Sequence, residues 1–262
     1  METVTSADGT VIAYDRVGDG PPLIVVNGAF STRAALVPPA DLARQFTVVT
    51  YDRRGRGDSG AVDIAGPFAA EREYEDLAAV AAATGAGAPF VFGHSSGGAI
   101  ALRAVAAGLQ AAGLVAYEAP FGNDDQPAPD VDPDQRIREL VAAGRNREAV
   151  VFWMIDVVRV PDLTRAQLDG APWVAALEPL ARTLPYDLAV TAGGVPEAEL
   201  GKITAPVLIL GGGDSPAWFR RSLADQAAAT PGAQLRTLDG FGHNVPPEVL
   251  APILIDFFTT KS

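Results

Sequence analysis

One short stretch, from residue 90 to residue 107, constrains the fold of this chain more than any other. An apolar run at 89–92 leads directly into Gly93-His94-Ser95-Ser96-Gly97, and residues 98–107 then show helical periodicity. A serine between two glycines at a sharp strand-to-helix turn has the spacing G-x-S-x-G, and the glycines leave the room that such a turn requires. The pattern predicts that Ser95 lies at the N-terminus of a helix, where backbone N–H groups stabilise negative charge.

The composition limits the kinds of protein to consider. The chain has 262 residues, of which 48% are hydrophobic, and this suits one large α/β domain or a domain with an insertion. A formal net charge of −12, without a run of Lys or Arg, argues against binding nucleic acid or an anionic membrane. The lack of cysteine excludes disulfides and thiol catalysis, and two histidines are too few for a multi-histidine metal site. We therefore expect neither a metal nor a cofactor.

The sequence predicts no membrane anchor and no export signal. No apolar run is long enough to span a bilayer, and the segment after Met1 lacks the charged and apolar regions of a signal peptide. We expect a cytoplasmic protein without a membrane partner. The sequence leaves the oligomeric state open, with a homodimer as one option.

Apolar runs and helical patterns alternate along most of the chain. Alternating side chains around Ala7-Asp8-Gly9 predict a hairpin, and Ser31 could cap a helix at 32–44 that Pro38-Pro39 interrupts. The other expected strands are 23–26, 46–51, 89–92, 113–117, 206–210 and 234–238, and the other expected helices are 71–83, 98–107, 217–229 and 246–259. Strands that alternate with helices predict an α/β fold, in which a mostly parallel sheet carries helices on both faces.

The segment 121–201 differs in character from the rest. After a stretch rich in Asp and Pro, helical patterns follow one another to residue 184, and no strand of the parallel type appears. We interpret 121–201 as a helical lid inserted into a core domain formed by 1–120 and 202–262. The large apolar side chains that could line a pocket beneath it are Phe121, Phe152, Trp153, Trp173, Leu184 and Tyr186. We select Trp173 and Tyr186 for substrate binding, because they lie near the predicted return to the core.

A charged, glycine-rich loop at 52–60 could be mistaken for a phosphate-binding loop. It lacks the lysine and the spacing of a P-loop, and another loop follows it where a P-loop is followed by a helix. We interpret it as a structural turn in which Asp52 pairs with the neighbouring arginines at 53, 54 and 56.

The order of these parts carries a resemblance. A serine in the elbow, an acid after a later strand and a histidine in the last loop resemble the α/β-hydrolase fold over nearly the whole chain. In that family a serine attacks an acyl carbon, a histidine takes its proton and a carboxylate orients the histidine. The resemblance implies that Ser95 is the nucleophile and that His243 is the base. The other histidine, His94, sits inside the elbow and is expected to pack beside the turn.

The resemblance also implies an oxyanion hole made of two backbone N–H donors. One donor is expected from Ser96, the residue after the nucleophile, and the other from Gly28 or Ala29 in the loop after strand 23–26. The family commonly has His-Gly in this loop, where this chain has Asn27-Gly28. Because the donor is backbone, the departure does not remove it.

Two carboxylates compete for the role of the triad acid. Asp214 lies in the loop after strand 206–210, but the usual spacing places the acid one residue later, where this chain has Ser215. Glu118 follows the preceding strand directly. A subset of the family that includes hydrolases of the macrolactone zearalenone is similar here, with an SSG elbow, a Glu after the next strand and no Asp at the usual place. We favour Glu118 and keep Asp214 as the alternative.

The sequence thus predicts a serine hydrolase that cleaves a carboxylic ester or lactone of an apolar substrate through an acyl-enzyme. Epoxide hydrolases and haloalkane dehalogenases have this fold with an aspartate as nucleophile, and Ser95 argues against both. Cofactor-free perhydrolases and carbon–carbon hydrolases use the same triad, and a ligand-binding protein without catalytic activity can retain it. These remain the alternative functions.

Overall fold

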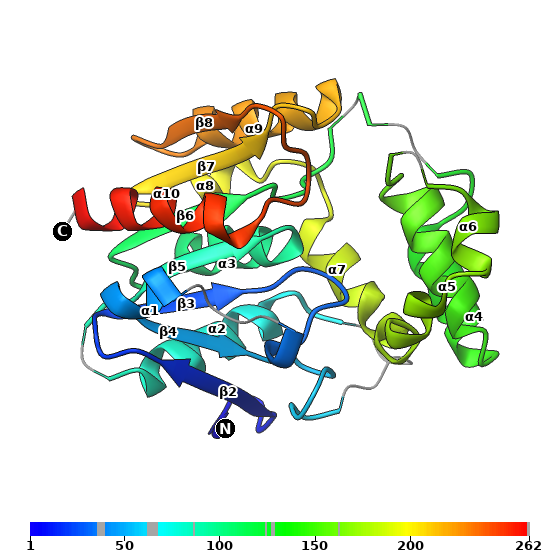
Figure 1. Ribbon diagram of the computed structural model, residues 1–262, viewed down its shortest axis with the longest axis horizontal. Coiled ribbons are helices and arrows are strands. Elements are labelled where there is room, and N and C mark those ends of the chain that lie inside the picture. The colour runs from blue at the N-terminus through cyan, green and yellow to red at the C-terminus, as the bar shows by residue number, and fades with distance from the viewer. Residues whose placement is uncertain are drawn as a thin grey trace.

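The structure is a computed structural model that describes residues 1–35, 40–61, 68–85, 87–123, 125–126, 129–161 and 163–260. It is organised around one sheet in the order β1-β2-β4-β3-β5-β6-β7-β8 (Figure 1). The strands are β1 (Glu2–Thr5), β2 (Val11–Val17), β3 (Pro22–Val26), β4 (Thr47–Tyr51), β5 (Phe90–His94), β6 (Gly113–Tyr117), β7 (Val207–Gly212) and β8 (Gln234–Leu238). β1 and β2 pair antiparallel, as does β2 with β4, and all other neighbours run parallel. The predicted α/β-hydrolase architecture is confirmed.

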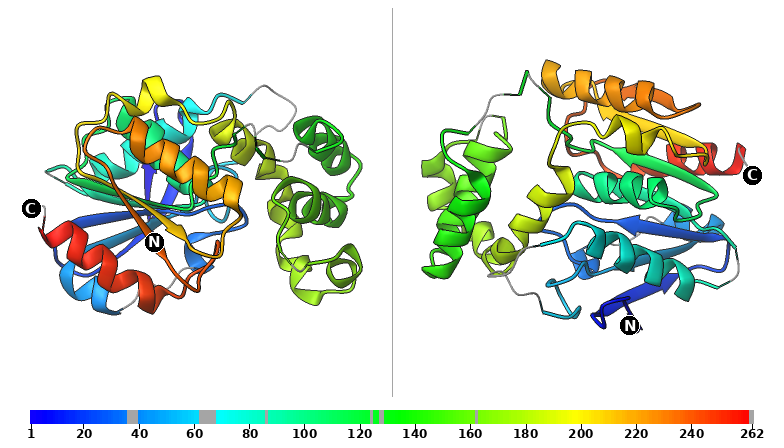
Figure 2. Two further views of the ribbon diagram at one scale, coloured as in Figure 1. Left: turned by 90° about the horizontal axis from the view of Figure 1, so that it is seen from above. Right: turned by 180° about the vertical axis from the view of Figure 1, so that it is seen from behind.

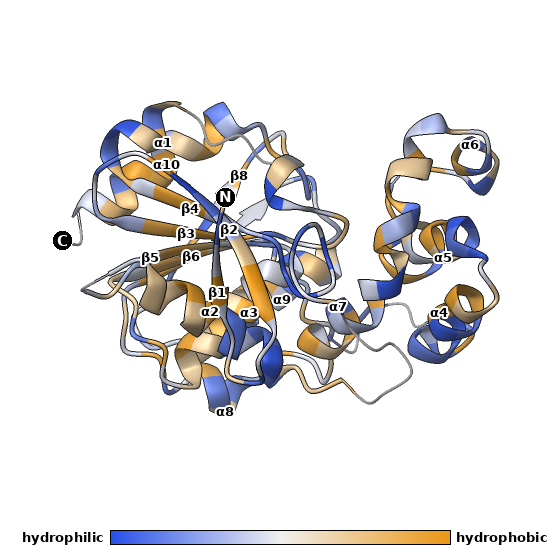
Figure 3. Cartoon of the chain, turned by 90° about the horizontal axis from the view of Figure 1, so that it is seen from below, coloured by the Kyte–Doolittle hydropathy of each residue, from blue (hydrophilic) through white to orange (hydrophobic). Residues whose placement is uncertain are grey.

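Helices cover both faces of the sheet (Figure 2). They are η1 (Arg33–Ala35), α1 (Ala40–Gln45), α2 (Glu71–Ala83), α3 (Ser96–Ala106), α9 (Ala217–Ala229) and α10 (Pro247–Thr260). Strand side chains alternate between the two faces: Ile24 and Val26 pack in the cluster with α2, α3 and α9, whereas Leu23 and Val25 pack with α1 and α10. Because both faces are covered, the central strands are apolar throughout, which Figure 3 shows as orange strands between the helices.

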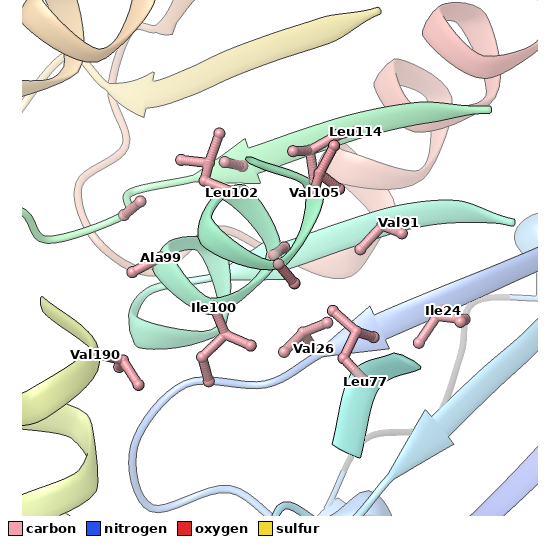
Figure 4. Close-up of a cluster of buried hydrophobic side chains, with 14 of the residues drawn as sticks. Ile24, Val26, Leu77, Val91, Ala99, Ile100, Leu102, Val105, Leu114 and Val190 are labelled. Atoms are coloured by element: carbon pink, nitrogen blue, oxygen red, sulfur yellow. The ribbon is translucent and has the colours of Figure 1, made fainter. Parts of the chain in front are cut away.

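The helix that follows the elbow lies at the centre of this packing. Ile100, Leu102 and Val105 of α3 are buried against the apolar side chains of β3, β5 and β6 (Figure 4). A fully buried side chain of this size contributes about 1.5–3 kcal/mol through the loss of water contact. The serine at the start of α3 is therefore carried by a helix that is buried in the apolar core.

Between β6 and β7 the chain forms a helical insertion, with no strand in the described part of 121–201. Its helices are α4 (Pro133–Ala142), α5 (Asn146–Phe152), the π-helical turn η2 (Trp153–Val157), α6 (Arg165–Asp169), η3 (Pro172–Ala176), η4 (Glu178–Thr183), α7 (Leu184–Thr191) and α8 (Glu197–Leu200). α4, α5 and α6 stand apart from the sheet, and α7 connects them to it (Figure 1). The insertion has its own apolar cluster, which includes Ile137, Val150 and Leu184, while Val190 of α7 packs in the cluster of the sheet.

The insertion is also where the predicted elements differ from the structure. The last part of the helical pattern that continues to residue 184 forms η3 and η4, each with a proline in its first turn. Pro185 lies in the first turn of α7, where the pattern predicted an end. In the core, the break expected at Pro38-Pro39 lies outside the described residues. No helix in the described parts of the chain is both long and apolar enough to cross a membrane.

The prediction that Asp52 pairs with the arginines beside it is wrong. Asp52 is buried and forms an ion pair with Arg33, whereas Arg54 pairs with Asp8 and Asp76. The arginines at 53 and 56 both pair with Asp187, and Arg53 also pairs with Glu73. The loop is a structural turn, but its charges join distant segments.

Candidate active site

Ser95 occupies a strained turn between β5 and α3. Its φ of 56° and ψ of −132° are rare for a residue with a side chain. Three glycines make room for the turn. A Cβ on Gly28 would lie 2.7 Å from the Cβ of Ser95, a Cβ on Gly93 would lie 2.6 Å from the Cα of Gly98, and one on Gly97 would collide with the carbonyl oxygen of Val26. The G-x-S-x-G spacing is therefore required by close backbone approach.

The carboxylate that contacts His243 is that of Glu118. Its Oε2 lies 3.3 Å from Nδ1 of His243, and its oxygens also accept hydrogen bonds from Gly212 N at 2.8 Å and from Ser215 Oγ at 3.0 Å. Glu118 is buried, and three donors fix its position. Ser215 stands at the position where the family usually has the acid, and its hydroxyl donates to Glu118.

The alternative acid, Asp214, is placed differently. It is exposed, and its backbone N–H donates to the carbonyl of Phe241. Among the described residues, no hydrogen bond joins its side chain to His243. The geometry therefore favours Glu118 for the role of orienting the histidine.

His94 and Tyr117 hold the loop that carries His243. They stand opposite each other on β5 and β6, and their rings stack at 5.7 Å. Nε2 of His94 lies 3.0 Å from the carbonyl oxygen of His243, and the Tyr117 hydroxyl donates to the carbonyl of Gly242. Because a carbonyl can only accept, Nε2 of His94 must carry a proton. Burial, followed by the proximity of His243, lowers the pKa of His94 to about 4, and burial, with the charge of Glu118, raises the pKa of Tyr117.

The predicted oxyanion donors lie together at the carboxyl ends of two adjacent strands. β3 and β5 are parallel neighbours, so the loop with Gly28 and Ala29 meets the elbow with Ser95 and Ser96. In the described structure, the backbone N–H groups of Ala29 and Ser96 donate to no protein acceptor. Donors without partners beside a candidate nucleophile can stabilise an oxyanion.

A cavity of about 250 Å³ lies in front of Ser95. The core contributes Gly28, Ala29, Phe30, Ser31, His94, Ser95, Ser96, Pro120, His243 and Asn244, and the insertion contributes Trp153, Met154, Val158, Val160, Asp187 and Thr191. The wall from the insertion is thus largely apolar. It comes from η2, from the residues that follow η2, and from α7.

The two aromatic residues selected for substrate binding do not line this cavity, which corrects the sequence prediction. Trp173 lies on η3 with about half of its surface exposed, and Tyr186 is buried with its ring against that of Phe68, at a centroid distance of 3.7 Å. Trp153 is the tryptophan at the cavity, where its ring meets Phe30 edge-on. It was among the aromatic candidates in the sequence, but no pattern separated it from the others.

Backbone strain marks the same region. The non-glycine residues with positive φ in the described structure are Phe30, Ser95, Glu118 and Arg159. The first two line the cavity, Glu118 contacts His243, and Arg159 stands between two valines of the cavity wall. Strained backbone of this kind costs on the order of 1–3 kcal/mol per residue and gathers at functional sites. The π-helical turn η2 is a second irregularity that is frequent at such sites.

A buried ion-pair network lies behind the cavity. Asp187 of α7 pairs with Arg53 and with Arg56, each at 2.7 Å, and also accepts a hydrogen bond from Ser96 Oγ at 2.6 Å. Arg53 pairs in addition with Glu73 at 2.7 Å. Burial alone would raise the pKa of Asp187, but the two guanidinium groups outweigh it, so this pKa is lowered. The network balances two cations with two anions, and it joins the insertion to the elbow.

This arrangement has the groups that nucleophilic catalysis requires. If Nδ1 of neutral His243 donates to Glu118, its Nε2 is left as an acceptor for a serine proton. No hydrogen bond joins Ser95 Oγ to the His243 ring in the described residues, although both side chains line the cavity. Contacts between nucleophile and base are often long before a substrate binds. No cluster of metal-ligating side chains is present in the part of the chain that the structure describes.

Comparisons with known proteins agree with the fold. The model of the alpha/beta hydrolase family matches residues 23–251. A crystal structure of an alpha/beta hydrolase from Sphaerobacter thermophilus is 46% identical over 98% of this chain and 100% of that chain, with a TM-score of 0.90.

Two more distant structures share the fold. An enol-lactonase from Burkholderia xenovorans is 19% identical over 98% of this chain and all of that chain, with a TM-score of 0.76. An esterase from a Rhodococcus species is 23% identical over 100% of this chain and 99% of that chain, with a TM-score of 0.70. These comparisons do not single out the zearalenone-hydrolase subset. The family match covers most of the chain, and the chain belongs to the alpha/beta hydrolase family.

Proposed function

We propose that this protein is a serine hydrolase that cleaves small apolar carboxylic esters or lactones through an acyl-enzyme. The observation that carries the proposal is the contact between Glu118 and His243 beside the strained Ser95, in one cavity with unpaired N–H donors. A nucleophile, an oriented base and an oxyanion site are the three parts of acyl transfer. The fold-level neighbours named as an esterase and an enol-lactonase are compatible with this reaction class.

In the first half of the proposed reaction, Ser95 Oγ attacks the acyl carbon and its proton passes to Nε2 of His243. The electron pair of the carbonyl bond moves to oxygen, where the N–H groups of Ser96 and Ala29 stabilise the charge. When the carbonyl re-forms, the bond to the leaving oxygen breaks and that oxygen takes the proton from His243. The product of this half is an ester on Ser95 and a free alcohol, or a single chain with both groups if the substrate is a lactone.

In the second half, water replaces the alcohol. His243 takes a proton from water, the resulting hydroxide adds to the acyl carbon, and the bond to Ser95 Oγ breaks as the serine recovers the proton. Glu118 stabilises the imidazolium in both halves without taking its proton.

The cavity supports a small and uncharged acyl group. Its volume of about 250 Å³ lies below the usual range of about 300–1,000 Å³ for ligand pockets. The insertion lines it with Trp153, Met154, Val158 and Val160, and Asp187, the one carboxylate among the described residues of its wall, is already paired with two arginines. We propose that the insertion serves as the lid that shapes this pocket.

The test combines turnover with covalent labelling. Purified protein is assayed with p-nitrophenyl acetate, butyrate and octanoate and with small lactones, and is then treated with a fluorophosphonate probe before intact-protein mass spectrometry. We expect hydrolysis with a preference for the shorter acyl chains, and one covalent adduct. Both turnover and adduct should be absent from Ser95→Ala and present in Ser222→Ala, which removes a buried hydroxyl bonded to the carbonyl of Phe121, away from the cavity.

The outcomes separate the alternative functions. Labelling that persists in Ser95→Ala would remove Ser95 from the mechanism. A single burst without turnover would indicate a ligand-binding protein that retains a triad. Turnover that requires hydrogen peroxide, or that cleaves a carbon–carbon bond in place of an ester, would assign the site to the other reactions of this triad.

A further inference from the structure

We propose that Arg56 is a positioning residue of the oxyanion hole, and that the helical insertion holds it in place. The inference rests on the proposed function and adds to it a residue that touches neither the substrate nor the triad. Arg56 lies in the charged, glycine-rich loop at 52–60, and its side chain is buried.

Arg56 is almost fully buried, and each of its three nitrogens has a partner. Nη1 donates to the carbonyl oxygen of Gly28 at 2.6 Å, Nη2 to Oδ2 of Asp187 at 2.7 Å, and Nε to Oγ1 of Thr183 at 3.2 Å. Two of these partners belong to the insertion and one to the loop after β3. The rigid fork of a guanidinium group can satisfy all three at once, which the single ammonium of a lysine cannot.

The bond to Gly28 determines where the next N–H points. The carbonyl of Gly28 and the N–H of Ala29 belong to the same peptide unit, and none of the described peptide bonds is cis. In a trans peptide these two groups point in opposite directions. Because the carbonyl points at Arg56, the N–H of Ala29 points away from Arg56, and Ala29 lines the cavity next to Ser95. This favours Ala29 over Gly28 as the second oxyanion donor.

The positive charge of Arg56, like its position, favours the N–H of Ala29 as an oxyanion donor. A cation bonded to the carbonyl end polarises the peptide unit and strengthens hydrogen bonds that its N–H end donates. The cation is buried, so water screens it little. Ser96, the other expected donor, is tied to the same network, because its hydroxyl donates to Asp187 and accepts from Arg53 at 3.1 Å. The same ion-pair network therefore contacts both segments that carry the expected oxyanion donors.

This arrangement gives the insertion a second role beyond lining the cavity. Asp187 and Thr183 are insertion residues, and they supply two of the three contacts of Arg56. Through them the position of α7 sets the position of the Gly28–Ala29 peptide. A network that only stabilised the fold would need no bond to that carbonyl.

The experiment compares Arg56→Lys and Arg56→Met with Arg54→Lys. Arg54 is a matched control, since it is buried in the same loop and paired with two carboxylates, Asp8 and Asp76, but among the described residues it forms no hydrogen bond with the loop of Gly28 and Ala29. For each variant, kcat and KM are measured with p-nitrophenyl butyrate, and Ki is measured for a trifluoromethyl ketone, which forms a tetrahedral oxyanion on the serine. Circular dichroism and thermal unfolding report on folding.

We expect both Arg56 variants to lose about 10- to 100-fold in kcat, since removing an oxyanion donor outright costs about 10²–10³. KM should change little, and Ki for the ketone should rise by the same factor as kcat/KM falls. Arg54→Lys should retain kcat and Ki. Thr183→Val, a milder change that removes only the partner of Nε, should show a smaller loss in the same direction, and it carries the test if Arg56→Met does not fold.

Equal losses in Arg56→Lys and Arg54→Lys would overturn the proposal, as would a fall in kcat without a matching rise in Ki. A folded Arg56→Met with unchanged kcat would overturn it as well. Failure of the proposed function gives a different result, because fluorophosphonate labelling would then survive in Ser95→Ala. If Ser95→Ala loses its label while Arg56 variants behave like the control, only the role of Arg56 is refuted.

Discussion

The carboxyl edge of the sheet and the helical insertion face the same cavity but position their residues in different ways. At the sheet edge, strand order alone brings the loops after β3, β5, β6 and β8 together, so Ser95, Glu118 and His243 meet although they are far apart in sequence. In the insertion, short helices are placed by side-chain contacts, and the two residues selected from the sequence, Trp173 and Tyr186, lie outside the cavity. Topology can be inferred from a pattern of strands, whereas the orientation of short helices cannot.

The two regions are joined by apolar packing at Val190 and by a buried network of charges. The sheet edge rests on the buried apolar clusters of α3 and α10, and the insertion has a separate apolar cluster of its own. Between them lies the network of Arg53, Arg56 and Asp187, with almost no exposed surface. Such ion pairs are strongly directional, so this network fixes the orientation of the insertion at the sheet edge as well as attaching it there.

The largest effect is expected at the sheet edge, from Glu118→Gln. The amide can no longer stabilise an imidazolium, and it can present its NH2 group to His243, which selects the wrong tautomer. We expect kcat to fall by about 10³- to 10⁴-fold with the fold intact. The measurement is kcat for an ester substrate, with circular dichroism as the folding check.

Asp214→Asn is the matched control for this prediction, because it makes the same chemical change in the neighbouring loop. Since Asp214 is exposed, we expect kcat to stay close to that of the unaltered protein. If Asp214→Asn lost more activity than Glu118→Gln, the role of triad acid would be assigned to Asp214. The main support for a resemblance to the family subset with a Glu as acid would then be removed.

The next prediction tests the buried ion pairs that join the insertion to the sheet edge. Asp187→Asn leaves two buried guanidinium groups facing one remaining carboxylate, Glu73, and breaking a buried pair in this way costs about 3–5 kcal/mol. We expect the free energy of unfolding, measured in urea, to fall by that order. Glu178→Gln is the control within the insertion, where its partly exposed pair with Arg147 should contribute much less. Similar losses in both variants would show that the buried network has no special part in joining the two regions.

A smaller effect distinguishes two tryptophans of the insertion. Trp153→Leu removes apolar surface from the cavity wall, so KM for an apolar ester should rise by about 10-fold, the usual scale for changed apolar contact in a pocket. Trp173→Leu, at a half-exposed position away from the cavity, should leave KM unchanged. A larger change at Trp173 would restore the sequence-based choice and reject the cavity as the substrate site.

The sequence predicted the sheet and its edge well because the signals there are local. The apolar runs, the glycines around Ser95 and the single histidine in the last loop each have a physical cause that can be read without knowing the fold. From the sequence, the candidates for the triad acid could be narrowed to Glu118 and Asp214. The hydrogen bond from the Ser215 hydroxyl to Glu118, which supports the preference for Glu118, could not be predicted. The partners of Arg53 and Arg56 could not be predicted, since Asp187 lies more than a hundred residues further along the chain.

The last prediction concerns the pH dependence of stability at His94, whose pKa is lowered to about 4 by burial and by the nearby His243. In the unfolded chain a histidine titrates near about 6.5, so between these values the unfolded state binds a proton that the folded state does not. Stability must therefore rise with pH across this window, which means that the contribution of neutral His94 is complete above about pH 6.5 and is lost as pH falls toward 4. His94→Gln keeps an N–H donor for the carbonyl of His243 but cannot titrate.

The measurement is the difference in unfolding free energy between the unaltered protein and His94→Gln, from urea titrations at several pH values from 4 to 8. We expect the advantage of the unaltered protein to shrink steadily as the pH falls from about 6.5 to 4, and to stay constant above that range. Carboxylates titrate in both proteins and cancel in the difference, so the slope isolates one side chain. A difference that does not change with pH would mean that His94 takes up its proton as readily in the folded protein as in the unfolded chain. The loop of His243 would then be held at the sheet edge by a weaker contact than the distance between Nε2 and the carbonyl implies.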